Sequence, residues 1–157
     1  KEEANADEAD SDEEEAAEAE ADEAEAELET AIEVEYDLRS EIVTYALQFV
    51  GNRYKYGGTN PNTGVDCSGF TSYVMRHAAE VELPHSSGGQ SRMGRQVSSS
   101  EMRPGDIICY GSGKRINHVA LYIGNGQIVH ASTERTGIKV SRWNYRTPVR
   151  IVNVLGD

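Results

Sequence analysis

Apolar residues recur at helical spacing over residues 39–50 of the chain. They share one face of the expected helix: Ile42, Val43, Ala46, Leu47, Phe49 and Val50. A period near 3.6 predicts a helix with one buried face, and the following Gly51 predicts its end. A second helix is expected over residues 67–80, because Asp66 is a favourable N-cap immediately before it.

From Pro104 onward the pattern changes to short apolar or alternating runs separated by turns. Such runs are typical of strands, and they cover residues 106–110, 118–123, 127–132, 139–142 and 150–154. Gly124-Asn125-Gly126 predicts a tight hairpin turn. Helices followed by an antiparallel sheet indicate an α+β domain. Between these regions we expect a Gly- and Asn-rich loop over 56–64 and a polar connector over 84–100, with a short helix near 91–94.

Charge divides the chain into two parts. Residues 1–41 carry a net charge of −18 and residues 42–157 a net charge of +6, which gives −12 for the whole. Ala and Glu favour helices, but dense like charges repel one another. We therefore predict a helical or disordered acidic linker over 1–36 and a globular domain over 37–157. The linker is interpreted as a spacer or, alternatively, as an electrostatic lid over the basic domain.

Several functional classes fit the composition poorly. The basic residues are scattered from Arg53 to Arg150, and this spread does not favour a nucleic-acid partner. No apolar run approaches the ~20 residues of a membrane span. Because Lys1 opens the chain, we expect a mature or trimmed form. Cys67 and Cys109 are the two cysteines, and a reactive Cys67 would leave both unpaired.

Cys67 lies in a setting that favours reactivity. The run Asp66-Cys67-Ser68-Gly69-Phe70 sets the thiol at a helix N-terminus, where the helix dipole is expected to lower its pKa. A nucleophilic cysteine also needs a base and a group that orients the base. A hairpin centred near Asn125 predicts that His118 and His130 lie roughly opposite each other. The residues alone leave three interpretations open: catalysis, a Cys-His-His zinc site, or structural roles.

Longer motifs surround these three residues. Tyr54-Lys55-Tyr56-Gly57-Gly58 and Gly64-Val65-Asp66-Cys67 precede the helix, and they are followed in order by Leu83-Pro84-His85-Ser86-Ser87, Arg103-Pro104-Gly105-Asp106, Asn117-His118-Val119 and Val129-His130-Ala131. Together these blocks resemble the NlpC-type peptidoglycan endopeptidases. The resemblance implies a papain-like fold in which the nucleophile helix packs on an antiparallel sheet. It also implies a cysteine peptidase that cleaves stem peptides after γ-D-glutamate and before diaminopimelate or lysine, through a thioester.

The resemblance also assigns roles to individual residues. Cys67 would be the nucleophile, His118 the base and His130 its orienting partner. Tyr56 is expected to help bind the oxyanion, and a further group is expected to contact substrate: Asp66, Ser68, Ser86 and Ser87. Ser86 stands where relatives that trim free muropeptides often carry Asp, which favours action on cross-linked or intact wall. No metal or cofactor is implied.

Other functions remain open at this level. The same Cys/His/His set would serve a peptidoglycan amidase or an acyltransferase, and the fold would also serve a non-catalytic wall-binding module. In every case the expected partner is the peptidoglycan stem peptide. We expect a monomer that works outside the cell or at the wall.

Overall fold

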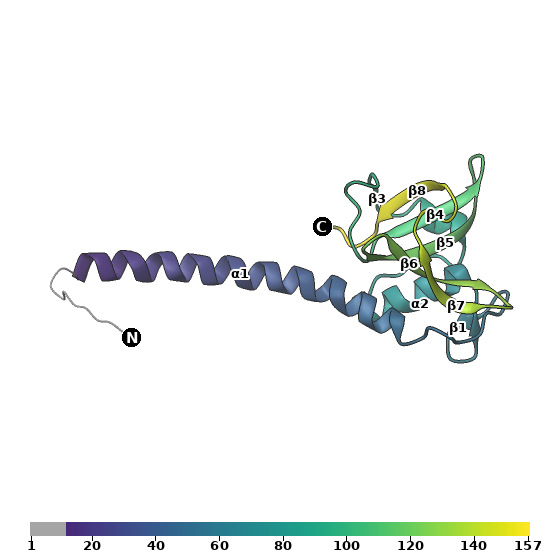
Figure 1. Ribbon diagram of the computed structural model, residues 1–157, viewed down its shortest axis with the longest axis horizontal. Coiled ribbons are helices and arrows are strands. Elements are labelled where there is room, and N and C mark those ends of the chain that lie inside the picture. Colours follow the sequence, from purple (N-terminus) through teal and green to yellow (C-terminus); the bar gives the residue numbers. More distant parts are fainter. Residues whose placement is uncertain (1–11) are drawn as a thin grey trace. The chain divides into compact units, whose positions relative to one another are not determined.

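Helix α1 runs without interruption from Asp12 to Leu47 (Figure 1). The computed structural model describes the backbone of residues 12–157 and the side chains of residues 17–29 and 38–157. The chain forms two compact units, residues 1–37 and 38–157. In the first unit the described side chains of 17–29 are all exposed, consistent with the lack of an apolar face there. Residues 1–11 of the acidic segment lie outside the described part.

The last ten residues of α1 belong to the second unit and have a buried face. Ile42 and Ala46 are buried, whereas Leu47 and Val50 of the expected face are partly exposed. The helix ends at Leu47, earlier than predicted. The amides of Phe49 and Val50 bond back three residues, so the final turn tightens into a 3₁₀-like form. None of the described helices is both long and apolar enough to cross a membrane.

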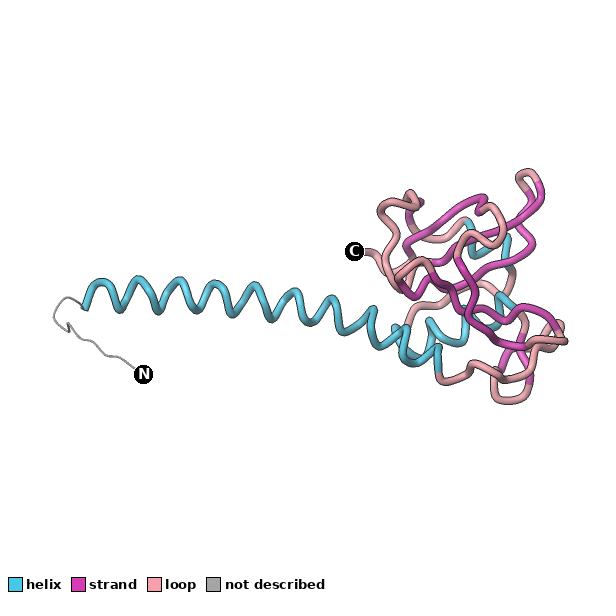
Figure 2. Tube along the Cα trace, in the orientation of Figure 1, coloured by secondary structure: helices cyan, strands magenta, loops and turns pink. Residues whose placement is uncertain are grey.

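Most strands belong to one antiparallel sheet, which follows the helices in the chain (Figure 2). Its spatial order is β3-β8-β4-β5-β6-β7. The strands are β3 (Arg95–Gln96), β4 (Ile107–Ser112), β5 (Arg115–Gly124), β6 (Gln127–Thr133), β7 (Gly137–Arg142) and β8 (Pro148–Asn153). A separate pair, β1 (Thr59–Asn60) and β2 (Gly64–Val65), closes the loop before the cysteine. The predicted α+β class is confirmed.

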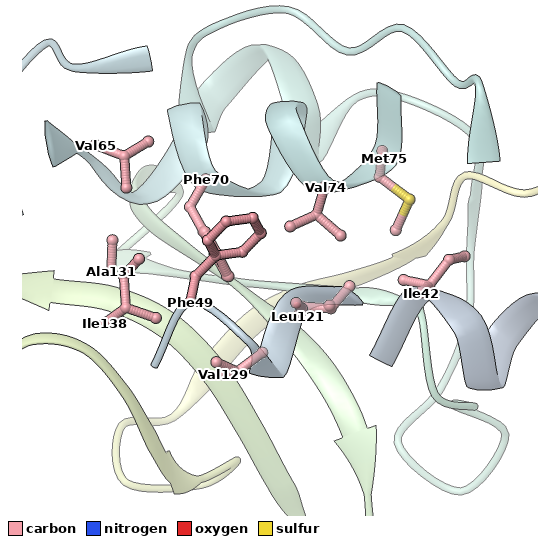
Figure 3. Close-up of a cluster of buried hydrophobic side chains, with 11 residues drawn as sticks. Ile42, Phe49, Val65, Phe70, Val74, Met75, Leu121, Val129, Ala131 and Ile138 are labelled. Atoms are coloured by element: carbon pink, nitrogen blue, oxygen red, sulfur yellow. The ribbon is translucent and has the colours of Figure 1, made fainter. Parts of the chain in front are cut away.

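Helix α2 (Cys67–Ala79) packs on this sheet, together with the end of α1. Figure 3 shows Phe70, Val74 and Met75 of α2 lying toward Ile42 and Phe49. The same cluster contains side chains from three strands: Leu121, Val129, Ala131 and Ile138. A second apolar cluster includes Tyr110, Ala120 and Ile128. Burial on both sides explains why the central strands read as nearly continuous apolar runs.

The short helix in the polar connector lies earlier than expected. Helix α3 covers Ser87–Ser91, whereas the prediction was 91–94. Ser86 sets its start, because the Ser86 hydroxyl accepts a hydrogen bond from the Gly89 amide at 2.9 Å. The buried Gln90 fixes the helix to α2: its side-chain amide donates to the Ser68 carbonyl at 2.9 Å.

Ion pairs join distant parts of the second unit. Arg39, near the end of α1, contacts Asp106 before β4 at 3.1 Å and Asp157 at 2.6 Å. The Arg39 guanidinium also donates to the Pro104 carbonyl at 2.7 Å. Asp106 is only 1% exposed, and a carboxylate that is so deeply buried needs such partners. Arg39 therefore holds the end of α1 to the start of the sheet.

Candidate active site

Asp66 organises the backbone around Cys67. Its Oδ1 accepts from the Gly69 amide at 2.8 Å and so caps α2, while Oδ2 accepts from the Gly57 amide at 3.0 Å. His85 Nε2 also lies 2.9 Å from Oδ1. A Cβ atom on Gly69 would lie 2.3 Å from the Gly58 carbonyl oxygen, so only glycine lets the loop approach the helix this closely. One carboxylate thus joins the loop, the helix N-terminus and the segment before α3.

The thiol of Cys67 does not follow the expected change in pKa. The prediction of a lowered pKa is wrong, because burial raises the pKa of this thiol. The amides of Val119, Ser68 and Cys67 itself act in the opposite direction, and the nearby Asp66 carboxylate adds to the rise. The direction of this shift favours the neutral thiol over the thiolate near pH 7.

The two histidine rings form a direct hydrogen bond. His118 Nε2 and His130 Nδ1 are 2.7 Å apart, and both side chains are buried. The strands pair Leu121 with Val129, a register that sets Ala120, not His118, opposite His130. The register thus differs by two residues from the one predicted, whereas the predicted closeness of the two histidines is confirmed. The two histidines are diagonal neighbours on one face, close enough for rings to meet.

Ser141 on β7 completes this chain of contacts. Its hydroxyl lies 2.9 Å from His130 Nε2, so both nitrogens of His130 are engaged. Among the described residues, the hydrogen bond of the His118 ring is the one made by Nε2, which leaves its Nδ1 as the nitrogen available to another group. Sequence reasoning missed Ser141. The detectable signal was the β6–β7 register, in which His130 pairs with Lys139 and Ser141 lies two residues further along.

Residues 143–146, between β7 and β8, contact the histidine pair. The Tyr145 ring lies 5.3 Å from the His130 ring and 5.3 Å from the Tyr110 ring. Arg146 donates to Asn117 at 3.0 Å. Burial, with a smaller effect from the Arg146 charge, lowers the pKa of His118 to about 4. Burial, His118 and Lys139 likewise lower the pKa of His130, so both rings are neutral at pH 7.

Cys67 and His118 are brought into one region but not into a hydrogen bond. Among the described contacts, the groups that bond the Cys67 sulfur are backbone amides, including that of Val119, the residue after His118. Burial raises the pKa of Tyr145, with a smaller contribution in the same direction from the nearby Cys67, and the Tyr145 ring also contacts His130. Hydrogen bonds of an active site are often loose before substrate binds, so the lack of a described bond between Cys67 and His118 does not exclude a pairing of the two.

Tyr56 is 84% exposed and lies beside the site rather than inside it. The position of its loop comes from the bond between Gly57 and Asp66. Tyr54, which the sequence did not single out, is partly buried, and the charge of Cys67 raises its pKa after the larger effect of burial. Two phenols, Tyr54 and Tyr56, thus lie on the loop that approaches Cys67.

The predicted serine contacts differ in accessibility. Ser68 is 5% exposed, and its carbonyl accepts from Gln90. Ser86 caps α3, as described above. Ser87 donates weakly to the Ile116 carbonyl at 3.5 Å. Ser86 and Ser87 therefore border the site from α3, whereas Ser68 is largely covered.

A metal ion finds no prepared site in the part of the chain that the structure describes. No group of three or more His, Cys, Asp or Glu side chains is arranged to hold one. The two histidine nitrogens that would face a shared zinc ion instead bond each other at 2.7 Å. Cys67 and Cys109 are both unpaired, and burial raises the pKa of Cys109 to about 12.

The fold and this arrangement are those of a papain-like α+β domain. The sequence model of the NlpC/P60 family matches residues 51–151. The chain belongs to the NlpC/P60 family, and the resemblance inferred from its motifs is confirmed. The crystal structure of the NlpC/p60 domain of the peptidoglycan hydrolase SagA superimposes with a TM-score of 0.68 at 32% identity. The match covers 73% of this chain and 97% of that domain.

Two curated relatives show how far the similarity extends. The murein DD-endopeptidase/LD-carboxypeptidase MepS of Escherichia coli (strain K12) is 41% identical over 108 residues, which are 69% of this chain and 56% of that protein. The probable endopeptidase p60 of Listeria seeligeri is 42% identical over 98 residues, which are 62% of this chain and 18% of that protein. The chain thus spans little more than half of the first relative and a small part of the second.

Proposed function

We propose that this protein is a cysteine peptidase that hydrolyses peptide bonds in bacterial peptidoglycan. The observation that carries the proposal is the hydrogen-bonded chain His118–His130–Ser141, which engages one nitrogen of His118, with no described partner at the other, on a strand whose next residue, Val119, bonds the Cys67 sulfur through its amide. The names of the relatives, a murein endopeptidase and a peptidoglycan hydrolase, support the substrate. On this proposal the protein works outside the cytoplasm, as a monomer.

The direction of the hydrogen bonds defines the base. When His118 Nε2–H donates to His130 Nδ1, His130 Nε2–H donates to the Ser141 hydroxyl, and His118 Nδ1 carries a lone pair. The reverse direction would put a proton on His118 Nδ1 and abolish its function as a base. We therefore assign Ser141 and His130 as positioning residues: the Ser141 hydroxyl can accept from His130 Nε2–H, and this direction is the one in which His118 acts as a base.

The reaction then follows from a neutral thiol and a neutral imidazole. His118 Nδ1 takes the proton of Cys67 as the sulfur attacks the scissile carbonyl carbon. The tetrahedral intermediate collapses to a thioester when the amide nitrogen leaves with the proton from His118. Water, deprotonated by the same nitrogen, hydrolyses the thioester and returns the proton to the thiol.

The oxyanion of the intermediate needs donors that are already in place. The Cys67 amide is one candidate, and a phenol of the approaching loop is the other. Removing one such donor costs about 3–4 kcal/mol, or roughly a hundred-fold or more in kcat. We expect one of the two variants Tyr56→Phe and Tyr54→Phe to show this loss of kcat. The variant that keeps its kcat then serves as the matched control. Equal, near-normal rates in both would remove the phenols from this role.

Substrate contacts are proposed at the rim of the site. Ser86 and Ser87 on the α3 side, with Asp66 beside Gly57, are the polar groups that a stem peptide would meet. Ser68 is assigned through its backbone amide, because its side chain is largely covered.

Two bonds are candidates for cleavage. Sequence resemblance indicates the bond after γ-D-glutamate and before diaminopimelate or lysine. The 41% identity to the E. coli relative, named a DD-endopeptidase, favours instead the D,D bond of a cross-link. Ser86, uncharged where muropeptide-trimming relatives often carry Asp, is compatible with both bonds when they lie within intact wall.

The deciding experiment digests purified diaminopimelate-type and lysine-type peptidoglycan with the wild type and with Cys67→Ala, followed by mass spectrometry of the products. Fragments that begin at diaminopimelate or lysine and depend on Cys67 would support the first bond. Loss of cross-linked dimers without new stem ends would support the second. Release of whole stems from the sugar would indicate an amidase, and transfer of a stem to an added amine an acyltransferase. No cleavage of either wall would overturn the proposal in favour of a binding module.

A further inference from the structure

A groove of about 590 Å³ lies between α3, the β4–β5 hairpin and β8. We call it the basic groove, because four cationic side chains line it: Arg92, Lys114, Arg115 and Arg150. Arg92 follows α3, Lys114 and Arg115 lie at the hairpin, and Arg150 lies on β8. The groove therefore collects positive charge from three separate segments, although charges of one sign repel each other at close range.

No acidic side chain balances this charge in the described part of the chain. No Asp or Glu is among the described residues that line the groove. Four of the eight acidic residues of the second unit are engaged elsewhere: Asp106 and Asp157 with Arg39, Asp66 at the α2 cap, and Glu101 with Ser98. None of the four cations forms an ion pair with a described residue, and the Nε–H of Arg150 is buried without a hydrogen-bond partner. An anion in the groove would relieve the mutual repulsion of these cations.

The groove borders the candidate active site. Ile116 lines it and also packs against the apolar cluster that Cys67 contacts. The Ile116 carbonyl accepts from Ser87 at 3.5 Å, and His118 follows two residues later on β5. A ligand in the groove would therefore lie on the same side of β5 at its start, near the residues that the proposed function assigns to the substrate.

We propose that the basic groove binds carboxylates of the peptidoglycan stem peptides that flank the bond being cleaved; this rests on the proposed function. Peptides linked through the γ-carboxyl of glutamate keep the α-carboxylate free, and diaminopimelate carries an additional one. Arginine recognises carboxylates through paired N–H donors. The groove selects anionic stem peptides over those whose carboxylates are amidated.

The test measures binding rather than cleavage. Cys67→Ala protein is sedimented with insoluble peptidoglycan, either native or with its carboxyls chemically amidated. The groove variant adds Arg92→Gln and Arg115→Gln, which are exposed positions. The control variant adds Arg135→Gln and Arg142→Gln, which remove the same charge from exposed positions outside the groove. We expect the groove variant to bind native wall roughly ten-fold more weakly, the control to bind within two-fold of its parent, and amidation to remove the difference.

Two results would overturn the proposal. Equal binding of the groove and control variants to native wall would mean that only net charge matters. A difference that survives amidation, but disappears once covalently attached phosphate polymers are stripped from the wall, would assign the groove to phosphodiesters. Thermal unfolding of both variants checks that they fold. Because the binding assay uses an inactive protein, its result is independent of which bond, if any, the wild type cleaves.

Discussion

The nitrogen atoms of two histidines carry most of the chemistry at the scale of single residues. His130 has both nitrogens engaged, by His118 and Ser141, while His118 keeps one free. The neutral state of both rings at pH 7 follows from their burial. A base that is neutral and held in one tautomer can accept the thiol proton without first losing its own.

Ser141→Ala tests whether the end of this chain affects the base. The substitution leaves His130 Nε2 buried without its partner, which costs about 1–2 kcal/mol. It also removes the contact that helps to hold His130 and His118 in one tautomer. We expect kcat to fall roughly ten-fold with little change in KM, because Ser141 does not border the substrate. Ser141→Thr keeps the hydroxyl and is expected to retain most of kcat. If alanine and threonine give the same kcat and pH profile, the hydroxyl has no positioning role.

Burial of His118 also makes stability depend on pH. Its pKa is about 4 in the folded protein and about 6.5 when unfolded. Between these values the unfolded chain binds a proton that the folded one excludes. The contribution of His118 to the free energy of unfolding is therefore fully present above pH ~6.5 and decreases as the pH drops toward 4. The free energy of unfolding, measured with urea, should be lower at pH 5 than at pH 7 by about 2 kcal/mol because of this residue. His118→Gln should reduce the difference, and an unchanged difference would contradict the assignment.

At the scale of elements, Asp66 holds together three segments around Cys67. It caps α2, holds the Tyr56–Gly58 loop through Gly57, and contacts His85. The close approach of Gly58 to Gly69 makes this junction sensitive to small shifts. The position of the Cys67 amide therefore depends on a side chain that need not react with substrate.

Two substitutions separate the capping role of Asp66 from its role in holding the loop. Asp66→Ala removes both and should cost about 1–2 kcal/mol of unfolding free energy. Asp66→Ser keeps a capping oxygen but cannot reach Gly57, so stability should largely return while kcat/KM stays low. Chemical denaturation and peptide hydrolysis measure the two effects. Full activity in Asp66→Ser would show that the loop contact is dispensable.

Sequence periodicity predicted the elements but not how they meet. The long strands and α2 were expected within a few residues, whereas the two-residue strands β1–β3 are too short to produce a pattern. Helix α3 was misplaced because its start depends on one capping serine. The roles of Ser141, Tyr145 and Arg146 depend on contacts between distant segments, which local pattern cannot reveal. The thiol pKa was predicted in the wrong direction because burial outweighs the helix dipole, and burial is a property of the whole fold.

At the scale of the whole molecule, Arg39 joins the two ends of the second unit. It contacts Asp106 before the sheet and Asp157, 118 residues away along the chain. The hydrogen bond from Arg39 is the main cause of the lowered pKa of Asp157. Because the pKa of Asp157 is lowered in the folded protein, its carboxylate stabilises the fold at every pH above the ordinary pKa of a carboxyl group. This contribution to stability is lost as the pH falls through the lowered pKa.

Arg39→Met should be among the most damaging changes remote from Cys67. It leaves Asp106 buried without its cation, at a cost of about 3–5 kcal/mol. Arg39→Met combined with Asp106→Asn removes the stranded charge and should recover part of this loss. Asp157→Asn should cost about 1 kcal/mol or less, because its carboxylate is partly exposed to solvent. Equal stability of the single and double Arg39 variants would contradict a buried, paired Asp106.

The boundary between the two units also separates charge. Residues 1–37 carry a net charge of −18 and residues 38–157 a net charge of +6. A single proteolytic cut between Asp37 and Leu38 would therefore turn an anionic protein into a cationic domain without altering one residue of its candidate site. The intact chain and the released domain would bind opposite ion exchangers at neutral pH. A protease acting there would thus change the affinity of the domain for any anionic surface, including the wall it is proposed to cleave.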